Sequence, residues 1–303
     1  MDIRQSTGFY DLCVNVQGND IKNLCCILSK LYEYGYRTVA LNTDIDESVL
    51  ATDKKKKKKN DEEASQNIIP ETLDIESIRK EFDKKLKIFS RITFFCSDSA
   101  KTHILNHCTA LKKYDLYAFA PKTQTALQYA CTQLNTDIIT LRSSSITFKL
   151  NKKLYEQAIE RGIHFEIQYA DLLNVQSRKL TIHYSHLFHT YGKSKHVILS
   201  SGASNVKTIR NPYDLINLSC LLGLNEVKAK ASILYQCKKL LLRAGIYINF
   251  HVNKSVSNYK FFLFLLFIER RRRGKAVFVI EEQTKTTNDT DKDSTVFPKR
   301  LKL

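Results

Sequence analysis

The chain repeats one pattern seven times between residues 9 and 245: a short apolar, β-rich run, then a segment with apolar residues spaced three and four apart. One such segment places Leu24, Ile27, Leu28 and Leu31 on a single helix face. Strands and helices that alternate with short connections predict parallel strands and right-handed crossovers, in a barrel or a doubly wound sheet. The expected strands are Phe9–Val16, Thr38–Ile45, Ile88–Cys96, Leu116–Ala120, Asp137–Leu141, His164–Tyr169 and His196–Ser200.

The last of these units carries the strongest local signals. Its strand ends in serines and Gly202, and a basic loop with Lys207 and Arg210 leads to Asn211 and Pro212. Asn suits an N-cap and Pro suits the first helical position, so a helix is expected to begin there. Free N–H groups beside two cations would suit a phosphate or another anion, and the alternative is a well-capped helix with solvated charges.

The positive charge belongs to the body of the chain. Residues 246–303 hold 12 basic and 6 acidic residues, and residues 46–85 hold 10 basic and 11 acidic residues. The rest of the chain therefore holds 26 basic and 14 acidic residues, an excess of positive charge. A basic folded body makes RNA or DNA the leading class of partner, and a generally basic soluble protein is the alternative.

The eight cysteines lie scattered in apolar segments and never form a C-x-x-C pair. They are therefore expected to be buried thiols in a reducing compartment, and neither a zinc site nor a disulfide framework is indicated. No apolar run approaches the ~18 residues of a membrane span, and the start has no signal-peptide pattern. We expect a soluble, unsecreted protein with no membrane partner.

The ordered segments FYDLCVNV, GYRTVALN, KIFSRITFFCSD, YDLYAFAPKT, ACTQLNTDIITL, RGIHFEIQYA and SSGASNVKTIRNPYDLINLSCLLGL resemble a known family. It is the thirty-kilodalton barrel subunit of eukaryotic nuclear ribonuclease P and RNase MRP. The resemblance covers roughly residues 9–45 and 86–245. It implies an α/β fold, a TIM-like barrel of about seven parallel strands related to the polymerase and histidinol phosphatase (PHP) phosphoesterases.

The resemblance also divides the chain. Residues 1–245 are expected to form the barrel domain, with a disordered lysine-rich insertion at about 46–80 and a possible short helix after Pro70. Residues 246–268 interrupt the family-like sequence and are rich in residues with A/T-rich codons, so we expect them to be intron-derived; a buried strand or helix is the alternative. Residues 269–303 are expected to be a basic, flexible tail.

Enzymatic motifs are missing. PHP phosphoesterases carry D-L-H-x-H on the first strand, where this chain has Cys13 and Asn15 in place of the two histidines. Metal-activated water needs several converging ligands, so we expect no catalytic residues, no metal and no cofactor. His103 and His107 with Cys108 have metal-ligand spacing, but they lack the Glu of H-E-x-x-H and are expected to be ordinary helix residues.

The resemblance implies a noncatalytic subunit that supports 5′-leader removal from precursor tRNA, in the nucleus and within it the nucleolus. Its expected partners are the RNA subunit, precursor tRNA and other protein subunits, including a small ferredoxin-like one. A metal-dependent phosphoesterase and a basic scaffold that binds only proteins are the alternatives. Cations after strand ends are the expected RNA contacts, because barrels carry function there. They are Lys122, Arg142, Lys207 and Arg210, with Arg91 inside the third strand as a further choice that could instead be a structural ion-pair residue.

Overall fold

The barrel is built from seven parallel strands that pair in sequence order, β1-β2-β3-β4-β5-β6-β7. The computed structural model describes residues 8–16, 20–48, 75–97, 111, 114–142 and 148–244. Each strand lies within two residues of its predicted bounds at either end, so the sequence pattern is confirmed. The strands are β1 Phe9–Asn15, β2 Tyr36–Asp46, β3 Lys87–Cys96, β4 Leu116–Pro121, β5 Ile138–Thr140, β6 His164–Gln168 and β7 Val197–Ser200.

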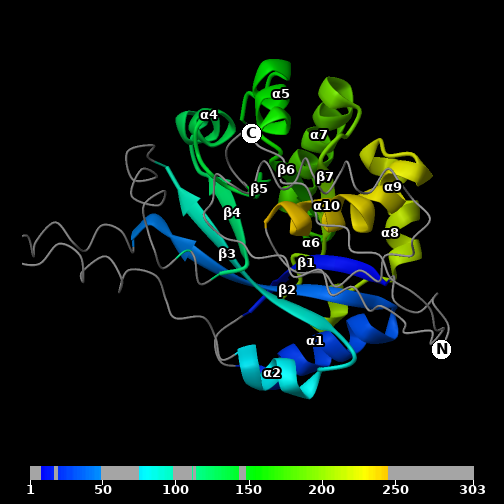
Figure 1. Cartoon of the computed structure of the whole chain (residues 1–303). Coiled ribbons are helices and arrows are strands. Elements are labelled where there is room, and N and C mark those ends of the chain that lie inside the picture. Colours follow the sequence, from blue (N-terminus) through cyan, green and yellow to red (C-terminus); the bar gives the residue numbers. More distant parts are fainter. Residues whose placement is uncertain are drawn as a thin grey trace, which may run out of the picture.

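Helices surround the strands and cover their outer faces (Figure 1). They begin where side chains can accept hydrogen bonds from free N–H groups: Asp20, Thr123, Asn151, Asn174 and Asn225 each cap one. The helices are α1 Ile21–Glu33, α2 Ile75–Glu81, α4 Gln124–Thr132, α5 Lys152–Glu160, α6 Ala170–Leu173, α7 Val175–Gly192, α8 Pro212–Leu218, α9 Glu226–Ile233 and α10 Tyr235–Arg243, with 3₁₀ turns η5 Val206–Thr208 and η6 Ser219–Leu222.

The core has three parts. One lies between β4–β7 and the helices outside them, where Tyr155, Phe165 and Phe188 stack. A second lies under α1 and α2. A third fills the amino-terminal half of the barrel interior, where Leu240 and Leu241 of α10 pack on residues such as Leu12 and Ile198. Helix α10 therefore closes the amino-terminal end of the barrel.

The barrel closes between β1 and β7 with little backbone pairing. A single bridge joins Val14 to Ala203, and backbone bonds run from Asn15 N to Ala203 O (2.8 Å) and from Gly202 N to Cys13 O (2.9 Å). Side chains add to this seam: Asp11 accepts from Ser201 N at 2.9 Å, and the Ser201 hydroxyl donates to Cys13 O at 2.9 Å. Closure at β1–β7 thus depends on polar side chains as well as on the backbone.

Several expectations fall partly or wholly outside the described residues. The helix after Pro70 is confirmed as α2, and Asp46 is the last residue of β2, but residues 49–74 of the expected insertion are not described. The same holds for His103, His107 and Cys108, for the segment 246–268 that we expect to be intron-derived, and for the tail 269–303. No helix in the described part of the chain is long and apolar enough to cross a membrane.

The cysteine expectation is partly wrong. All seven described cysteines are free thiols, and four of them are buried in the core. Cys26 and Cys220 are exposed, because they lie on the outward faces of α1 and η6. Apolar neighbours in the sequence do not distinguish the two faces of these short helical segments.

Candidate functional site

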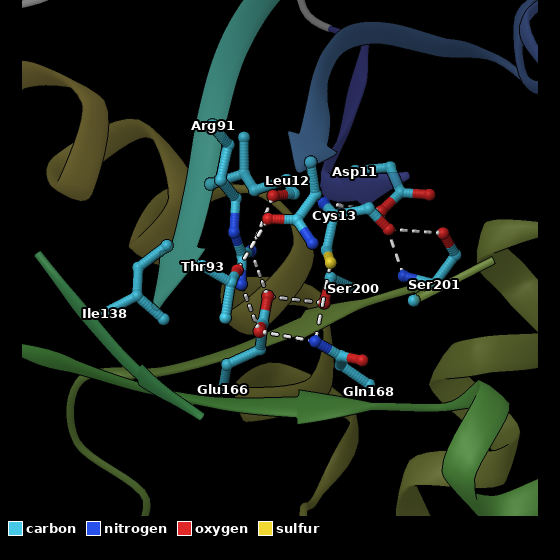
Figure 2. Close-up of polar contacts among 12 residues, drawn as sticks. Asp11, Leu12, Cys13, Arg91, Thr93, Ile138, Glu166, Gln168, Ser200 and Ser201 are labelled. Carbon is cyan, nitrogen blue, oxygen red and sulfur yellow. Dashed lines mark hydrogen bonds and ion pairs between the residues drawn. The ribbon is translucent and has the colours of Figure 1, made fainter. Parts of the chain in front are cut away.

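A buried ion pair occupies the barrel interior, where Arg91 of β3 reaches across to Glu166 of β6 (Figure 2). Arg91 Nη1 and Nη2 donate to the two Glu166 carboxylate oxygens at 2.5 and 2.6 Å, and Nη1 also donates to Leu12 O at 2.7 Å. Both side chains are 0% exposed. Two parallel N–H···O bonds are the strongest geometry for such a pair.

Neighbouring side chains complete the hydrogen bonding of Glu166. The Ser200 hydroxyl donates to Oε1 at 2.7 Å, and Gln168 Nε2 donates to Oε2 at 2.9 Å. Burial alone would raise the pKa of Glu166, but the Arg91 charge and these hydrogen bonds hold that pKa below its ordinary value. The pKa of Arg91 stays above its ordinary value in spite of burial, because the charge and hydrogen bonds of the Glu166 carboxylate favour the charged form. Both groups are therefore charged at neutral pH.

Cys13 and Asn15 face the same interior. Burial raises the pKa of the Cys13 thiol well above its ordinary value, and Gln168 Nε2 lies 3.4 Å from its sulfur. The Asn15 amide oxygen accepts from Asn42 Nδ2 at 2.7 Å, while its own Nδ2 donates to Gly202 O at 2.8 Å. A neutral thiol and an amide that is already hydrogen-bonded are poor ligands for a transition metal. Among the described residues, no group of three His, Cys, Asp or Glu side chains is placed to hold a metal ion.

Asp11 lies at the seam in an unusual state. Burial raises the pKa of Asp11 from 3.8 to about 6. The backbone N–H groups of Ser201 and Cys13 donate to its Oδ1 atom, and these hydrogen bonds offset only part of that rise. Its Oδ2 atom is buried without a hydrogen-bond partner. The Asp11 carboxylate is therefore costly to ionise, although it holds the seam together.

Two of the predicted RNA-contacting cations meet carboxylates at the carboxyl ends of the strands. Lys122, after β4, forms an ion pair with Asp46, and Arg142 Nη1, after β5, lies 3.0 Å from Asp44 Oδ2. The Arg142 guanidinium also lies over the Phe95 ring, 5.8 Å from its centroid. A small hollow beside Leu141 has the acidic residues Glu166 and Asp171 in its lining. This end of the barrel therefore has mixed charge.

Lys207 and Arg210 lie elsewhere. Both are exposed, in or just after η5, and the hydroxyl of Tyr36, the first residue of β2, donates to Arg210 O at 3.2 Å. Asp46, the partner of Lys122, is the last residue of the same strand. It lies ten residues after Tyr36, which corresponds to about 30 Å along β2. The four cations therefore form two separate pairs.

The helix start predicted after this loop is confirmed. Asn211 accepts from Tyr213 N and Pro212 begins α8. An anion at this position remains a prediction.

Arg91 has the second of the two roles expected for it, that of a structural ion-pair residue. Its side chain is 0% exposed and is held by Glu166, so it presents no exposed atom to RNA. RNA could reach it only if the core opened. The sequence shows a charged residue inside the apolar strand HFEIQ, but it does not show that Glu166 faces Arg91 across the barrel.

Three histidines on α7 have no common site. His183, His186 and His189 are all exposed, and a ring nitrogen of His186 lies 3.2 Å from Leu221 O. Their spacing of three residues moves them around the helix surface, so they share no common face.

Comparisons with known proteins identify the family. Residues 8–247 match the family model described as RNase P subunit p30. The chain belongs to this family. The mouse ribonuclease P protein subunit p30 is 30% identical over 240 residues, which cover 78% of this chain and 85% of that protein. The Arabidopsis thaliana protein GAMETOPHYTE DEFECTIVE 1 is 35% identical over 166 residues, 54% of this chain but only 29% of that longer protein.

A solved structure supports the fold. A chain in the cryo-EM structure of archaeal ribonuclease P with mature tRNA is matched over its full length and over 82% of this chain, with a TM-score of 0.54 and 16% identity. The p30 family resemblance predicted from ordered strand ends and turns is confirmed by these comparisons.

Proposed function

We propose that the chain is a noncatalytic protein subunit of ribonuclease P, and also of RNase MRP, and that it supports removal of the 5′ leader from precursor tRNA. The family match over residues 8–247 carries this proposal. A budding yeast relative, 26% identical over 216 residues, is a ribonuclease P/MRP subunit, which favours a role in both particles. The partners are the RNA subunit and other protein subunits, including a small ferredoxin-like one, and the location is the nucleus and nucleolus.

The noncatalytic role rests on the barrel interior. Related phosphoesterases begin their metal cluster with two histidines on the first strand, where this chain has Cys13 and Asn15. The space beside them holds the Arg91–Glu166 pair, whose charges satisfy each other. A cation bound there would meet a guanidinium, so the donor set does not suit metal-activated hydrolysis.

We expect the highly purified chain alone to leave precursor tRNA intact, with magnesium or with manganese. The reason is the poor ligand set around Cys13 and Asn15. The measurement is cleavage followed on a gel, with reconstituted ribonuclease P as the positive control. Metal-dependent turnover by the chain, lost in a Glu166→Gln variant that remains folded, would instead make the protein a phosphoesterase.

We expect Lys122→Ala, Arg142→Ala, Lys207→Ala and Arg210→Ala to weaken association with the RNA subunit. A cation bound to a phosphate releases counterions, so a variant without that cation should show a slope of log K against log[salt] that is shallower by about 0.7 to 0.9. Titrations at several salt concentrations measure this. Lys207 and Arg210 are exposed, whereas Lys122 and Arg142 must exchange Asp46 and Asp44 for phosphate, so the first pair should have the larger effect.

The matched control for these variants is Lys152→Ala. Lys152 also pairs with a carboxylate, Glu156, but it lies on α5. Its removal should leave the salt slope unchanged. If all four test variants keep both the affinity and the slope of the parent chain, these cations are solvated surface charges and do not face RNA.

A further inference from the structure

One tyrosine on the outside of the barrel is exposed and yet held by other aromatic rings. Tyr213, the second residue of α8, is 64% exposed. Helix α8 stands beside the start of β1 (Figure 1), and there the Tyr213 ring meets the ring of Phe9, with centroids 5.9 Å apart and planes 77° from parallel. Phe9 in turn meets the buried ring of Tyr36 at 6.2 Å, also edge-to-face. Two aromatic contacts therefore connect the exposed ring to the core.

This support distinguishes Tyr213 from an ordinary surface residue. Single exposed apolar side chains are common on proteins and need no explanation. Tyr235, which begins α10 and is 54% exposed, is of that kind, because no aromatic ring among the described residues packs against it. A ring that is both accessible and fixed loses little conformational freedom when another flat ring stacks on it. Tyr213 is thus preorganised to bind a flat ligand.

Two buried tyrosine hydroxyls fix the backbone three residues before Tyr213. Tyr36 Oη donates to Arg210 O at 3.2 Å, and Arg210 N donates to Tyr169 Oη at 3.3 Å. Tyr36 and Tyr169 are buried, whereas the Arg210 side chain is exposed. Tyr36 therefore contacts both the Phe9 ring that supports Tyr213 and the backbone of Arg210. The exposed ring and the exposed cation are held by the same buried residue.

The cations of this loop have no carboxylate partner. Lys207 and Arg210 are exposed, and neither forms an ion pair with a described carboxylate, including that of Asp214. At the carboxyl end of the barrel, by contrast, Lys122 and Arg142 each pair with an aspartate. A phosphate can therefore bind to the Lys207–Arg210 loop without first displacing a carboxylate.

We propose that Tyr213, Arg210 and Lys207 form a binding site for an unpaired nucleotide of RNA, with the base stacked on the Tyr213 ring and the adjacent phosphates on the two cations. The choice of RNA rests on the proposed function. Proteins bind single-stranded RNA by this combination of an aromatic platform and a positively charged path for the backbone. A base in a duplex is covered by its neighbours, so only an unpaired base can stack on an exposed ring.

The site deepens the proposed function, because it adds a contact to a base to the expected contacts with phosphates. Every base has a flat π-face, so stacking on Tyr213 should show little preference for sequence. The site also lies apart from the expected contact near Lys122, since Phe9 and Tyr36, the first residues of β1 and β2, support it. The chain would thus touch RNA at two separate places.

Binding of a short, labelled oligoadenylate to the full chain, measured by fluorescence anisotropy at several salt concentrations, tests the site. We expect Tyr213→Ala to weaken binding by about fivefold or more, the effect of one lost stacking contact. Its slope of log K against log[salt] should equal that of the parent, because no phosphate contact is lost. Arg210→Ala should weaken binding and also make that slope shallower by about 0.7. Tyr213→Phe, which keeps the ring, should bind like the parent.

Two controls separate stacking from charge and from general surface effects. An abasic oligonucleotide with the same number of phosphates should bind the parent chain as weakly as oligoadenylate binds Tyr213→Ala, and the substitution should not weaken it further. Tyr235→Ala removes a tyrosine of similar exposure that has no aromatic support, and it should keep the parent affinity. Circular dichroism of each variant checks that it is folded.

The outcomes separate the alternatives. Equal affinity of the parent and Tyr213→Ala for oligoadenylate, or an equal loss for oligoadenylate and the abasic oligonucleotide, would overturn the stacking site. If Tyr213→Ala keeps its oligoadenylate affinity but releases a protein subunit from reconstituted ribonuclease P, the surface docks a protein and the proposal is likewise wrong. The proposed function is tested separately by binding to the RNA subunit. A parent chain that binds oligoadenylate through Tyr213 but not the RNA subunit would contradict that function and leave the site intact.

Discussion

Glu166→Gln is expected to destabilise the protein by about 3–5 kcal/mol, the cost of leaving a buried charge without its partner. Arg91 remains charged because its pKa lies above its ordinary value, and it is 0% exposed, so water cannot replace the missing carboxylate. Gln is nearly the same size as Glu, which limits the contribution from a cavity. Urea unfolding followed by circular dichroism measures the change.

Two controls define the origin of this effect. The double variant Arg91→Met with Glu166→Leu removes both charges and should recover most of the stability, because well-packed apolar residues can replace a buried ion pair. Glu156→Gln breaks the exposed pair with Lys152 on α5 and should change little. A double variant as unstable as Glu166→Gln alone would mean that shape, and not charge, matters at this position.

Asp11→Asn is expected to stabilise the protein at neutral pH. The folded pKa of Asp11 is about 6 and its ordinary value is 3.8. Below pH 4 the carboxyl is protonated in both states, so ionisation costs nothing. Between pH 4 and 6 the unfolded chain releases the proton and the folded chain keeps it, so stability is lost as pH rises. The advantage of the variant should therefore grow by about 2 kcal/mol from pH 4 to pH 7.

The difference between variant and parent isolates Asp11, because His164 and His196 titrate in both proteins. Their low pKa values have the opposite effect, since stability is lost as pH falls below the ordinary histidine value. Asp46→Asn is the matched control: Lys122 lowers the pKa of Asp46 below 3.8, so that variant should lose stability relative to the parent only as pH rises toward 4, and the difference should stay nearly constant from pH 4 to pH 7. A difference between Asp11→Asn and the parent that stays constant from pH 4 to pH 7 would contradict the assigned pKa.

The sequence predicts the strands well because local patterns determine them. The seven apolar runs and caps such as Asn211 depend on neighbouring residues, and all lie where the pattern places them. The interior cannot be predicted in the same way. Arg91 and Glu166 are 75 residues apart and meet only when the sheet closes into a barrel. Whether Arg91 faces RNA or a carboxylate is therefore a property of the closed barrel and not of its own strand.

The amino-terminal end of the barrel shows the same limit. His164 and His196 begin two expected strands, but their stacking depends on β6–β7 register, and Lys239 reaches them only because α10 folds back across the barrel. Nothing in the local sequence of α10 distinguishes Lys239 from its neighbour Lys238. Function in barrel folds is expected at the carboxyl ends of strands, so no sequence pattern singles out the charges near strand starts.

The seam between β1 and β7 has a consequence for the behaviour of the whole protein. A sheet of seven strands has two edges, and exposed edges are templates for pairing with other chains. Here the edges face each other and are covered by residues 201–203, which bond to both Cys13 and Asn15. If this short segment detached, two parallel strand edges would be exposed at once. Protection against self-association therefore depends on a few hydrogen bonds around Ser201 and Ala203 more than on the large apolar core.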